Sequence, residues 1–537
     1  MQKVLTAAQM REVDRLTTER YGIPSILLME NAAHAVARVI TEKLGGSVAG
    51  KSILILCGKG NNGGDGAALG WKLALADARV EIILFGKVGD TKGNARINFE
   101  AATREVDWLR EVESREAWDK WLYRSWQDWD AVVDAVFGTG LNRPMEVWLG
   151  NVVRDMNIVN EGTHEPRRVA VSIDVPSGLD SDSGEPIGEC FQADLTVTFT
   201  FPKAANVLAP ASGFGGELFV EDIGAPDDLQ DEFESALFVA EENDARGWLT
   251  DTGFENSSFK NKRGHAFVIA GSEDYSGAAV LAGNAAMRSG VGLVTVATPK
   301  SSKDSVASRV LPEVMVRGVA ETESGLIAEN AFEEIADLLE KADSVAIGCG
   351  LAQDDSTKKF VETIVENRRQ PTIIDADALN LLSPFASEAA KGERAAPLIL
   401  TPHEGEFMRL LGTGDKDVIK DRVAAVRDFA EKHNVILLLK GERVLIGAPD
   451  GRVVVNPTGN SGLGKAGNGD TLTGIIAGFV AQAVRMEIDI IETVIAAVNI
   501  AGMAGDIAEK KYGKRVMTAS DVRECLAEVF RSFDSSK

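Results

Sequence analysis

The chain has 537 residues, of which 45% are hydrophobic and 26% charged, a composition typical of soluble domains with hydrophobic cores rather than of disordered or fibrous proteins. A single core stops growing near ~250–300 residues, so we expect two domains of similar size. The 57 Lys and Arg against 81 Asp and Glu give a net charge of −24 at pH 7, which excludes a general nucleic-acid-binding surface because the protein's own field repels phosphates.

Cysteine spacing and apolar runs argue against disulfides, structural zinc and membrane spans. No two cysteines form a C-x-x-C pair, and no histidine stands near one at metal spacing. The N-terminal residues lack a signal-peptide pattern, and the apolar stretches Ile475–Val484 and Val435–Leu439 fall short of the ~20 residues of a spanning helix. We therefore expect reduced, buried thiols in a cytoplasmic protein without a membrane segment. The cysteines are Cys57, Cys190, Cys349 and Cys525.

Short β-branched runs alternate with longer helical stretches, which predicts an α/β fold with parallel sheets covered by helices on both faces. The expected strands of the first half are Ser52–Cys57, Arg79–Phe85, Ala131–Val136, Val169–Asp174 and Asp194–Thr200. Those of the second half are His265–Ala270, Leu293–Ala297, Ser344–Ile347, Thr372–Asp375, Leu398–Thr401 and Val435–Lys440, followed by a hairpin of Arg443–Ile446 and Gly451–Val455.

The acidic stretch Glu221–Glu255 carries no useful apolar stripe, so we place the domain boundary within it, near Gln230. The predicted domains are residues 1–228 and 229–537.

Five of the eight tryptophans lie between Asn98 and Asp130. A platform for stacking nucleotide bases is one reading of this stretch. An amphipathic helix packed on its sheet is the better one, because Trp118 and Trp121 are three residues apart with charged residues between them. The five are Trp108, Trp118, Trp121, Trp126 and Trp129.

A glycine-rich segment, Gly58–Gly66 (GKGNNGGDG), follows the first strand and leads into an expected helix at about Ala67–Asp77. It satisfies the G-x-G-x-x-G pattern in which glycines let the backbone approach a pyrophosphate. In the usual pattern an acid about 20 residues later binds a ribose hydroxyl, but Glu81 falls inside the second strand. The segment also carries two asparagines and Asp65, which a plain phosphate loop does not need.

Two more loops stand at the carboxyl ends of later strands, where open α/β sheets bind ligands. Asn62, Asp134 and Ser177 offer hard oxygen ligands from three loops at one sheet edge, which suits an alkali or alkaline-earth cation. Asp174 is left free as an acid or base, although a strand-end aspartate is more often a turn cap. The loops are Val133–Pro144 (VDAVFGTGLNRP) and Ser172–Asp180 (SIDVPSGLD).

These three motifs, in this order, resemble the NAD(P)H-hydrate epimerase domain over about Met1–Asp222. The resemblance implies a Rossmann-like fold, potassium at Asn62, Asp134 and Ser177, and Asp174 at the reacting nicotinamide hydrate. One carboxyl group that donates and reaccepts a proton would let the ring nitrogen expel water and take it back on the other face. The dinucleotide contacts implied are Asn61, Asn62, Gly63, Gly64, Asp65, Gly138, Thr139, Gly140, Leu141, Asn142, Arg143 and Pro144.

In the second half, Gly459–Lys465 imitates a P-loop, but Ala466 stands where the Mg²⁺-binding hydroxyl belongs, and the segment follows a hairpin. What remains is Gly467–Asp470 at a helix start, where unpaired N–H groups favour the charge of a transferring phosphoryl group. Asp470 is then either the base that takes a proton from an attacking hydroxyl or a helix N-cap, and this pattern alone favours neither.

With the loops around Ala278, Asp375–Asn380, Thr401–Phe407 and Lys440–Val444, this segment is similar to the ribokinase-like, ADP/ATP-dependent NAD(P)H-hydrate dehydratase family over about Gly264–Arg531. By itself His403 would more often be a structural histidine, so its role depends on that resemblance. The implied contacts with the hydrated nucleotide are Ala278, Gly350, His403 and Asp470, and those with the adenosine phosphate are Lys440, Gly441, Glu442, Arg443, Val444 and Gly469.

Two departures from that family affect the expected site. Asn468 replaces the usual Ser or Thr before Gly-Asp, while Cys349 and Ala352 replace the expected Pro and Gly. Because Asn468 keeps its backbone N–H, the anion hole can persist.

The combined prediction is a fused repair enzyme: the first half interconverts the epimers of hydrated NADH or NADPH, and the second dehydrates one of them with ADP or ATP, with Mg²⁺ accompanying the nucleotide. We expect small-molecule substrates and a homo-oligomer. The first alternative is a ribokinase-like small-molecule kinase with a regulatory nucleotide-binding first half. The second is a nucleotide-sensing or scaffold protein without turnover.

Overall fold

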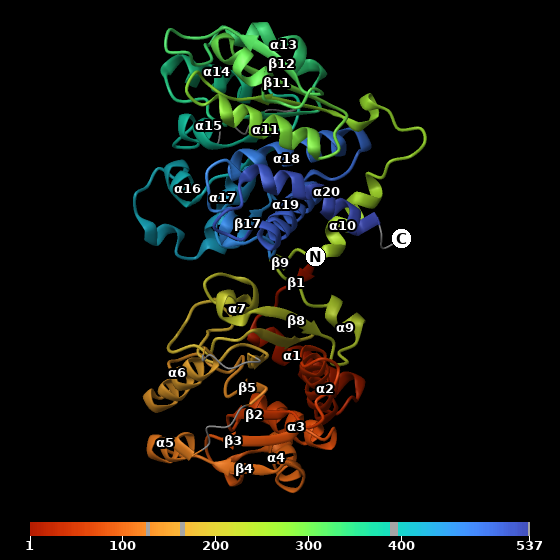
Figure 1. Cartoon of the computed structure of the whole chain (residues 1–537), viewed down its shortest axis with the longest axis vertical. Helices are drawn as coiled ribbons and strands as arrows, with labels where there is room; N and C mark the ends of the chain where they lie inside the picture. The colour runs from red at the N-terminus through yellow and green to blue at the C-terminus, as the bar shows by residue number, and fades with distance from the viewer. Residues whose placement is uncertain (125–128, 162–166, 387–395, 535–537) are drawn as a thin grey trace. The chain divides into compact units, whose positions relative to one another are not determined.

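The computed structural model describes residues 1–124, 129–161, 167–386 and 396–534, and the chain forms two compact units (Figure 1). The N-terminal unit is Lys3–Ser235, and the C-terminal unit is Ala236–Lys537 together with Met1–Gln2. The chain thus divides a few residues after the boundary expected from its acidic stretch. That stretch also holds more regular structure than its composition suggests: α9 (Asp227–Asp231), β9 (Leu237–Val239) and α10 (Glu242–Asp251).

A seven-stranded, fully parallel sheet forms the N-terminal unit, in the order β4-β3-β2-β5-β6-β7-β8. The order reverses between β2 and β5, and this switch point is where open parallel sheets bind ligands. The Gly58 loop follows β2 and the Val136 loop follows β5, so both lie at that point. The strands are β2 (Ser52–Cys57), β3 (Arg79–Leu84), β4 (Trp108–Glu111), β5 (Ala131–Ala135), β6 (Val169–Ile173), β7 (Leu195–Phe199) and β8 (Glu217–Glu221).

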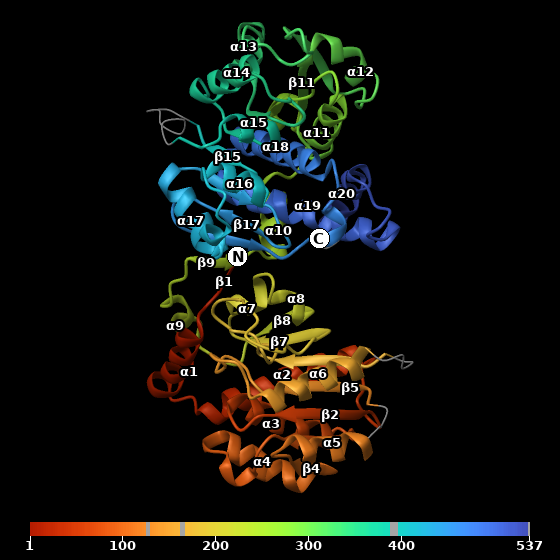
Figure 2. The ribbon, with the colours of Figure 1, turned by 90° about the vertical axis from the view of Figure 1, so that its left-hand side faces the viewer.

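Helices cover both faces of this sheet (Figure 2). Alternating strand residues divide the core: Ile53 and Ile55 of β2 pack with α2, α3 and α4, whereas Leu54 and Leu56 pack with α5 and α6. This gives the three-layer α/β/α arrangement that the sequence predicted. The helices are α1 (Ala7–Tyr21), α2 (Ser25–Lys43), α3 (Asn61–Leu75), α4 (Gly93–Glu105), α5 (Arg115–Arg124), α6 (Val147–Glu161), α7 (Ala204–Val207) and α8 (Ser212–Gly215).

The C-terminal unit contains an eleven-stranded sheet in the order β1-β9-β18-β17-β16-β15-β14-β13-β10-β11-β12. Strands β10 to β16 run parallel, and β17 is antiparallel to both of its neighbours, as expected for the hairpin. The strands are β1 (Gln2–Lys3), β10 (His265–Ile269), β11 (Leu293–Pro299), β12 (Met315–Val319), β13 (Ser344–Ile347), β14 (Thr372–Ile374), β15 (Leu398–Leu400), β16 (Ile436–Leu439), β17 (Val444–Gly447) and β18 (Val453–Asn456).

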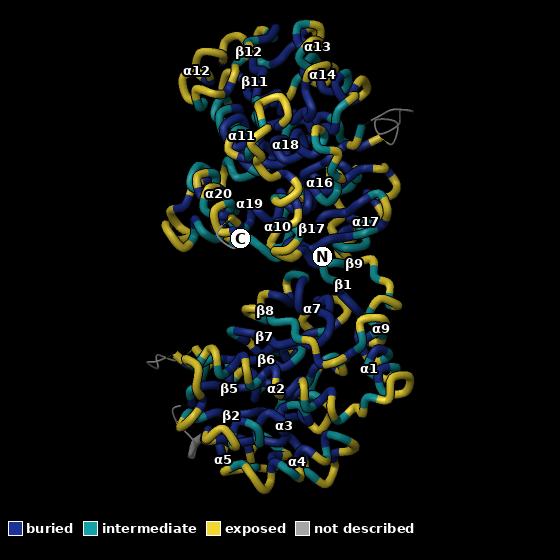
Figure 3. The backbone as a smooth tube through the Cα atoms, turned by 90° about the vertical axis from the view of Figure 1, so that its right-hand side faces the viewer, coloured by how far each residue is buried: buried dark blue, intermediate teal, exposed yellow. Residues whose placement is uncertain are grey.

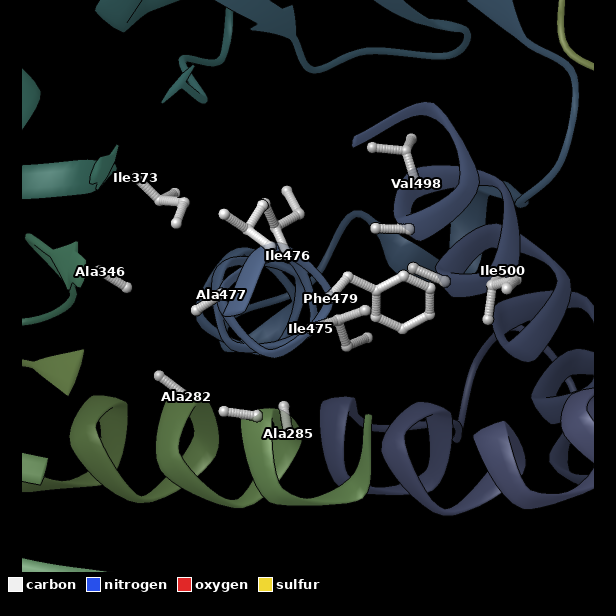
Figure 4. Packing of buried hydrophobic residues seen from close by; sticks show 14 of the residues in the cluster. Ala282, Ala285, Ala346, Ile373, Ile475, Ile476, Ala477, Phe479, Val498 and Ile500 are labelled. Carbon is white, nitrogen blue, oxygen red and sulfur yellow. The ribbon is translucent and has the colours of Figure 1, made fainter. Parts of the chain in front are cut away.

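The centre of this unit is α18 (Asn468–Met486), which is buried on nearly all sides (Figure 4). Its side chains point toward Ala282 and Ala285 of α11, toward Ile373 of the sheet, and toward Ile500 of α19. A helix that is apolar all round is stable only when enclosed in this way. The helices are α11 (Ser276–Arg288), α12 (Lys303–Ala307), α13 (Ala331–Lys341), α14 (Asp355–Glu366), α15 (Ala376–Leu381), α16 (Glu404–Leu410), α17 (Arg422–His433), α18, α19 (Ile490–Tyr512) and α20 (Ala519–Asp534).

Helix α19 is a longer apolar segment than the sequence reading recognised. Ile490–Tyr512 is long and apolar enough to cross a membrane by length and composition alone, and 67% of its most apolar window is buried inside the protein. Val494, Ile495 and Ile500 belong to the core shared with α18. Figure 3 marks the buried parts of the backbone in dark blue. The helix therefore packs as a core element.

The tryptophan-rich stretch contains the expected amphipathic helix, α5, which packs on the sheet, although the helix does not include all five tryptophans. Trp108 lies in the edge strand β4, while Trp118 and Trp121 are buried on α5. Trp121 stacks on Trp129 at 5.7 Å between ring centroids, so these rings fill the core rather than form a base-stacking platform. Trp126 lies outside the described residues.

Candidate active sites

The N-terminal unit has a cavity of about 1350 Å³ at the carboxyl ends of its strands. Loops after β2, β5 and β6 line it, together with residues of α1 and α2. Most of the predicted dinucleotide contacts line this cavity, but Gly63, Gly64 and Asn142 do not. The contacts that do are Asn61, Asn62, Asp65, Gly138, Thr139, Gly140, Leu141, Arg143 and Pro144.

The glycine segment is largely a helix N-terminus, because α3 begins at Asn61 and not near Ala67 as expected. The first backbone bond of the helix runs from the Gly64 N–H to the Gly60 carbonyl, so the preceding N–H groups have no acceptor within the helix. A side chain at Gly63 would lie 1.8 Å from the Gly58 oxygen, so the tight approach of loop and helix requires glycine. This is an anion-binding helix end of the kind that holds pyrophosphate.

Asp174 stands at the end of β6 in a network of donors. The Lys203 Nζ forms an ion pair with its Oδ1 at 2.7 Å, and the Thr198 hydroxyl donates to the same oxygen at 3.0 Å. The Asn206 amide donates to its backbone carbonyl at 3.0 Å. Its φ of +68° is left-handed, a strained conformation that a non-glycine residue keeps only when its surroundings enforce it.

Two further aspartates line the same cavity, and neither has a hydrogen bond or ion pair within the described part of the chain. Burial raises the pKa of Asp14, on α1, to about 6, with Lys203 opposing the shift and Asp174 adding to it. Burial also raises the pKa of Asp65 well above its usual value, and the charges of Asp174 and Asp14 add to this. The cavity thus joins one paired and two unpaired carboxyl groups.

Two of the three predicted cation ligands are hydrogen-bonded to each other, and the third, Asn62, lies beside Gly138 of the loop after β5. Asp134 accepts hydrogen bonds from the Ser177 hydroxyl at 2.6 Å and its backbone N–H at 2.7 Å, and also from the Ser172 hydroxyl. Asn62 is the opposite case: both polar atoms of its amide are buried with no hydrogen-bond partner among the described residues. An orphaned buried amide signals a missing ligand, so the set fits a hard cation.

Glu81 has a structural role instead of the ribose-binding one of the usual fingerprint. Its carboxylate accepts from the Trp121 indole N–H at 2.8 Å and pairs with Arg110 at 2.6 Å. It therefore anchors α5 to β3, away from the carboxyl ends of the strands.

In the C-terminal unit, a buried ion pair joins two strand ends. The Lys440 Nζ lies 2.7 Å from the Asp375 Oδ1, and the Thr473 hydroxyl donates to Oδ2 at 2.8 Å. Burial alone would raise the pKa of Asp375, but Lys440 and the hydrogen bonds bring it below its usual value. The Asp375 side chain is only 2% exposed, so this carboxylate is a fixed charge.

Asp470 lies beside that pair on the first turn of α18. Burial raises its pKa to about 6, and the charge of Asp375 adds to the shift, while Cys349 and Lys440 oppose it. The first helical bond of α18 runs from the Thr471 N–H to the Gly467 carbonyl, so the Gly469 and Asp470 N–H groups have no acceptor within the helix. A side chain at Gly469 would lie 3.6 Å from the Lys440 Nζ, so the helix end and the lysine converge.

The other predicted contacts with the hydrated nucleotide lie at two places in the C-terminal unit. Gly350 packs against Ala278, since a side chain at Gly350 would lie 2.8 Å from the Ala278 Cβ, and Gly350 follows Cys349 beside Asp470. His403 caps α16: its Nδ1 accepts from the Gly405 N–H at 3.0 Å, and its side chain is 57% exposed. It reaches the site through the backbone, where it forms a bridge with Lys440.

The Lys440–Val444 loop connects β16 to β17, with Val444 already in the strand. Gly441 lies against the Arg422 guanidinium, because a side chain there would lie 2.5 Å from the Arg422 Nη2. Arg443 donates to the Pro457 carbonyl. The loop thus contains Glu442 and Arg443 and is bordered by the guanidinium group of Arg422.

The two departures from the family pattern have different consequences. The Asn468 Nδ2 donates to the Leu463 carbonyl at 3.0 Å, which ties its side chain back to the loop and leaves the helix end open. Ala352 has a φ of +57°, in the left-handed region where the expected glycine would be unstrained.

Sequence reasoning missed several residues of both sites. Lys203 carried a usable signal, since it follows the strand ending near Thr200 at the ligand-binding edge. Asp375 was recognised in a motif but given no role, although it forms the buried pair. Asp14 carried no local signal, because it belongs to an ordinary-looking helix that precedes every motif.

Fold and sites together define a two-unit α/β protein in which each unit brings a glycine-rich helix start, a Lys–Asp ion pair and an aspartate without an ion-pair partner among the described residues to one sheet edge. Residues 25–205 match the family described as YjeF-related protein N-terminus, and residues 266–528 match the family described as NAD(P)H-hydrate dehydratase.

Full-length relatives share both halves. The bifunctional NAD(P)H-hydrate repair enzyme Nnr of Moorella thermoacetica is 37% identical, over 99% of this chain and 97% of the relative. That of Thermofilum pendens is 33% identical, over 99% and 96%. The chain belongs to this family of bifunctional NAD(P)H-hydrate repair enzymes. Among solved structures, the ADP/ATP-dependent NAD(P)H-hydrate dehydratase of Bacillus subtilis, co-crystallised with ATP/Mg²⁺, is 32% identical with a TM-score of 0.48 and covers 55% of this chain and 98% of its own.

Proposed function

We propose that the N-terminal unit interconverts the R and S epimers of hydrated NADH and NADPH, and that the C-terminal unit dehydrates the S epimer with ADP or ATP. The observation that supports this most is the presence of a separate acid–base site in each unit of a chain that matches the repair family over its whole length. Fusion has a kinetic benefit, since an attached epimerase keeps the unused epimer from accumulating.

In the N-terminal cavity, the N–H groups at the start of α3 hold the pyrophosphate, and the Gly138–Pro144 loop holds the rest of the dinucleotide. The reacting ring then lies at Asp174. A proton delivered to the ring hydroxyl lets the nitrogen lone pair expel water and form a planar cation, and water added from the other face gives the second epimer.

Potassium is proposed at Asn62, Asp134 and Ser177, where the orphaned Asn62 amide supplies the open ligand. When bound, the ion supplies fixed positive charge beside the dinucleotide phosphates. Replacing K⁺ by choline should slow epimerisation in the parent chain and change little in Asn62→Ala, whereas an equal loss in both would remove Asn62 from the set.

In the C-terminal site, Asp470 takes the proton of the hydrate's hydroxyl as its oxygen attacks the terminal phosphoryl group of the nucleotide. The Gly469 and Asp470 N–H groups and Lys440 stabilise the charge on the transferring group. Phosphate is a better leaving group than hydroxide, so the ring nitrogen then expels it and the nicotinamide double bond reforms. Mg²⁺ accompanies the nucleotide phosphates, and the Lys440–Val444 loop holds the adenosine phosphate.

The donor is proposed to be ADP, since the fused architecture resembles the ADP-using members, and a cytoplasmic homo-oligomer is proposed as its working form. Size-exclusion chromatography with light scattering checks the oligomeric state, and a parallel rate comparison of ADP and ATP checks the donor.

The deciding experiment mixes racemic NADH hydrate with ADP or ATP and follows the recovery of reduced-nicotinamide absorbance. Two phases are expected, a fast one for the S epimer and a slow one limited by epimerisation, with no recovery when nucleotide is omitted. Asp174→Asn should slow only the second phase, after subtraction of spontaneous epimerisation. A stable phosphorylated product in place of recovered absorbance would contradict the proposal and favour a small-molecule kinase.

A further inference from the structure

Inversion of the hydrated carbon requires both a proton donor and a proton acceptor, and Asp174 alone is poorly suited to be both. Water must leave one face with an added proton, and water must arrive on the other face and lose one. Asp174 is tied on Oδ1 to Lys203 and Thr198, and the Thr139 N–H lies 3.4 Å from Oδ2. Every one of these partners donates to the carboxylate, so the arrangement suits a proton acceptor better than a donor.

Asp14 is the carboxyl group placed to complete the reaction. It reaches the cavity from α1, a different element from the β6 end that carries Asp174, and within the described residues it has no hydrogen-bond or ion-pair partner. Asp14 lines the same cavity as Lys203 and Asp174, and the charges of both act on it, so it lies on the side of the cavity that holds Asp174. Its pKa of about 6 lets it hold a proton and still release it near neutral pH.

Asp65 is less suited to this role. It lies on the first turns of α3, at the helix end proposed to hold the pyrophosphate. Burial, with the charges of Asp174 and Asp14, raises its pKa well above the usual range, so it releases a proton less readily than Asp14 does.

We propose that Asp14 and Asp174 form an acid–base pair that shares one proton and acts from opposite faces of the nicotinamide ring. This inference rests on the proposed epimerase function and deepens it. In one direction the Asp14 carboxyl donates its proton to the departing hydroxyl, the C–O bond breaks, and the ring nitrogen supplies the electron pair. Water then adds to the other face and gives its proton to the Asp174 carboxylate.

The return reaction reverses these roles, so both groups are needed in both directions. Between turnovers the proton passes back from one carboxyl group to the other through water in the open cavity. Other charged groups facing this region are Asp65 of α3, Lys203 before α7, and Arg11 of α1 itself. The remaining charged residues lining the cavity are Lys59, Glu113, Arg143 and Glu146.

The test isolates the epimerase by omitting ADP and ATP, so that the dehydratase is silent. Purified R epimer is converted by the full-length chain, and the two epimers are separated by chromatography. Asp14→Asn should lower kcat by about 10²–10⁴, the usual contribution of general acid–base catalysis, while calorimetry gives an unchanged dissociation constant for the hydrate. Asp14→Glu should restore part of kcat, and Asp90→Asn, an exposed isosteric change in the same unit, should have no effect.

Oxygen-18 water provides a second readout, because it tests the cleavage of the C–O bond that the proposed inversion requires. Each inversion should place one solvent oxygen on the ring carbon, and Asp14→Asn should lose exchange and inversion together. A fall in kcat of less than tenfold in Asp14→Asn, a loss confined to KM, or inversion that retains the original oxygen would overturn the inference.

A larger loss of kcat in Asp65→Asn than in Asp14→Asn would also overturn it. Failure of the parent chain to epimerise at all would instead refute the proposed function, so the two failures are distinguishable.

Discussion

The N-terminal and C-terminal sites combine the same side-chain types in different arrangements. In the first, Lys203 pairs with Asp174 at 2.7 Å; in the second, Lys440 pairs with Asp375 at 2.7 Å. Asp14 and Asp470 form no ion pair with any described residue, although Cys349 lies within hydrogen-bonding reach of Asp470. Burial raises the pKa of both unpaired aspartates to about 6. Each site also opens at a glycine-rich helix end.

The difference lies in how the paired carboxylate is exposed. Asp375 is 2% exposed, whereas Asp174 is 13% exposed and lines the cavity. Phosphoryl transfer needs one moving proton and one fixed charge, while inversion at carbon needs two groups that exchange protons. In the proposed mechanisms, similar side chains therefore serve one-base chemistry in the C-terminal unit and two-base chemistry in the N-terminal unit.

Removing the unpaired aspartate of the C-terminal site should have the largest effect. Asp470→Asn cannot accept the hydroxyl proton, so we expect nucleotide-dependent recovery of NADH to fall by about 10²–10⁴. Epimerisation measured without nucleotide should be unchanged. Asp337→Asn, an exposed change on α13, is the matched control. Recovery within tenfold of the parent rate would contradict the role of Asp470.

Replacing each lysine by methionine tests how much each ion pair contributes to the free energy of unfolding. Lys440→Met leaves the Asp375 charge buried and unpaired, so we expect a stability loss of about 3–5 kcal/mol in the C-terminal unit. Lys203→Met should cost less, because Asp174 borders an open cavity. Urea unfolding followed by circular dichroism measures both, and Lys440→Met with Asp375→Asn should recover part of the loss. Equal costs for the two lysines would remove this distinction.

The kcat/KM values of the two activities should change in opposite directions as the pH rises. Asp470 works as a base and must be ionised, so kcat/KM of dehydration should rise about tenfold per pH unit and level off above its pKa of about 6. Asp14 works first as an acid and must carry its proton, so kcat/KM of epimerising the R form should fall as pH rises above about 6. Separate assays from pH 4.5 to 8 would test this, and slopes of the same sign would contradict it.

The smallest expected effect concerns the loop before α14. Ala352→Gly removes the strain of an alanine held in the left-handed region. Because glycine also makes the unfolded chain more flexible, part of this gain is lost, and we expect the free energy of unfolding to rise by about 0.5–1 kcal/mol. Ala352→Val should destabilise the same unit, since a branched side chain tolerates this conformation least. A gain from valine would show that backbone strain is absent there.

Much of the fold could be predicted because buried parallel strands are continuous apolar runs. The runs at Ser52–Cys57 and Ser344–Ile347 correspond to β2 and β13 without change. The strands missed include β4 and β12, which lie at sheet edges and are half exposed, so their sequences lack such a run. Strands buried on both faces can therefore be recognised in the sequence, whereas half-exposed edge strands are missed.

The sites were predictable to the extent that their residues stand at strand ends inside recognisable loops. Asp174, Asp470 and Lys440 met that condition. Asp14 did not, because it reaches the site only through the packing of Met10 and Val13 of α1 against Phe201, which follows β7. The length of the Gly58 loop was also misjudged, because glycines discourage helices locally, yet α3 begins inside the loop and is held by tertiary packing.

The neighbouring strands β1 and β9 give the protein a nested order of assembly. Met1–Gln2 belong to the C-terminal unit, and the next residues, Lys3–Ser235, form the other unit before the chain returns at β9. β1 therefore pairs with a strand that is made more than two hundred residues later in the chain. An affinity tag fused in front of Met1 would therefore disturb the packing of the C-terminal unit, although it is attached next to the N-terminal unit in the sequence.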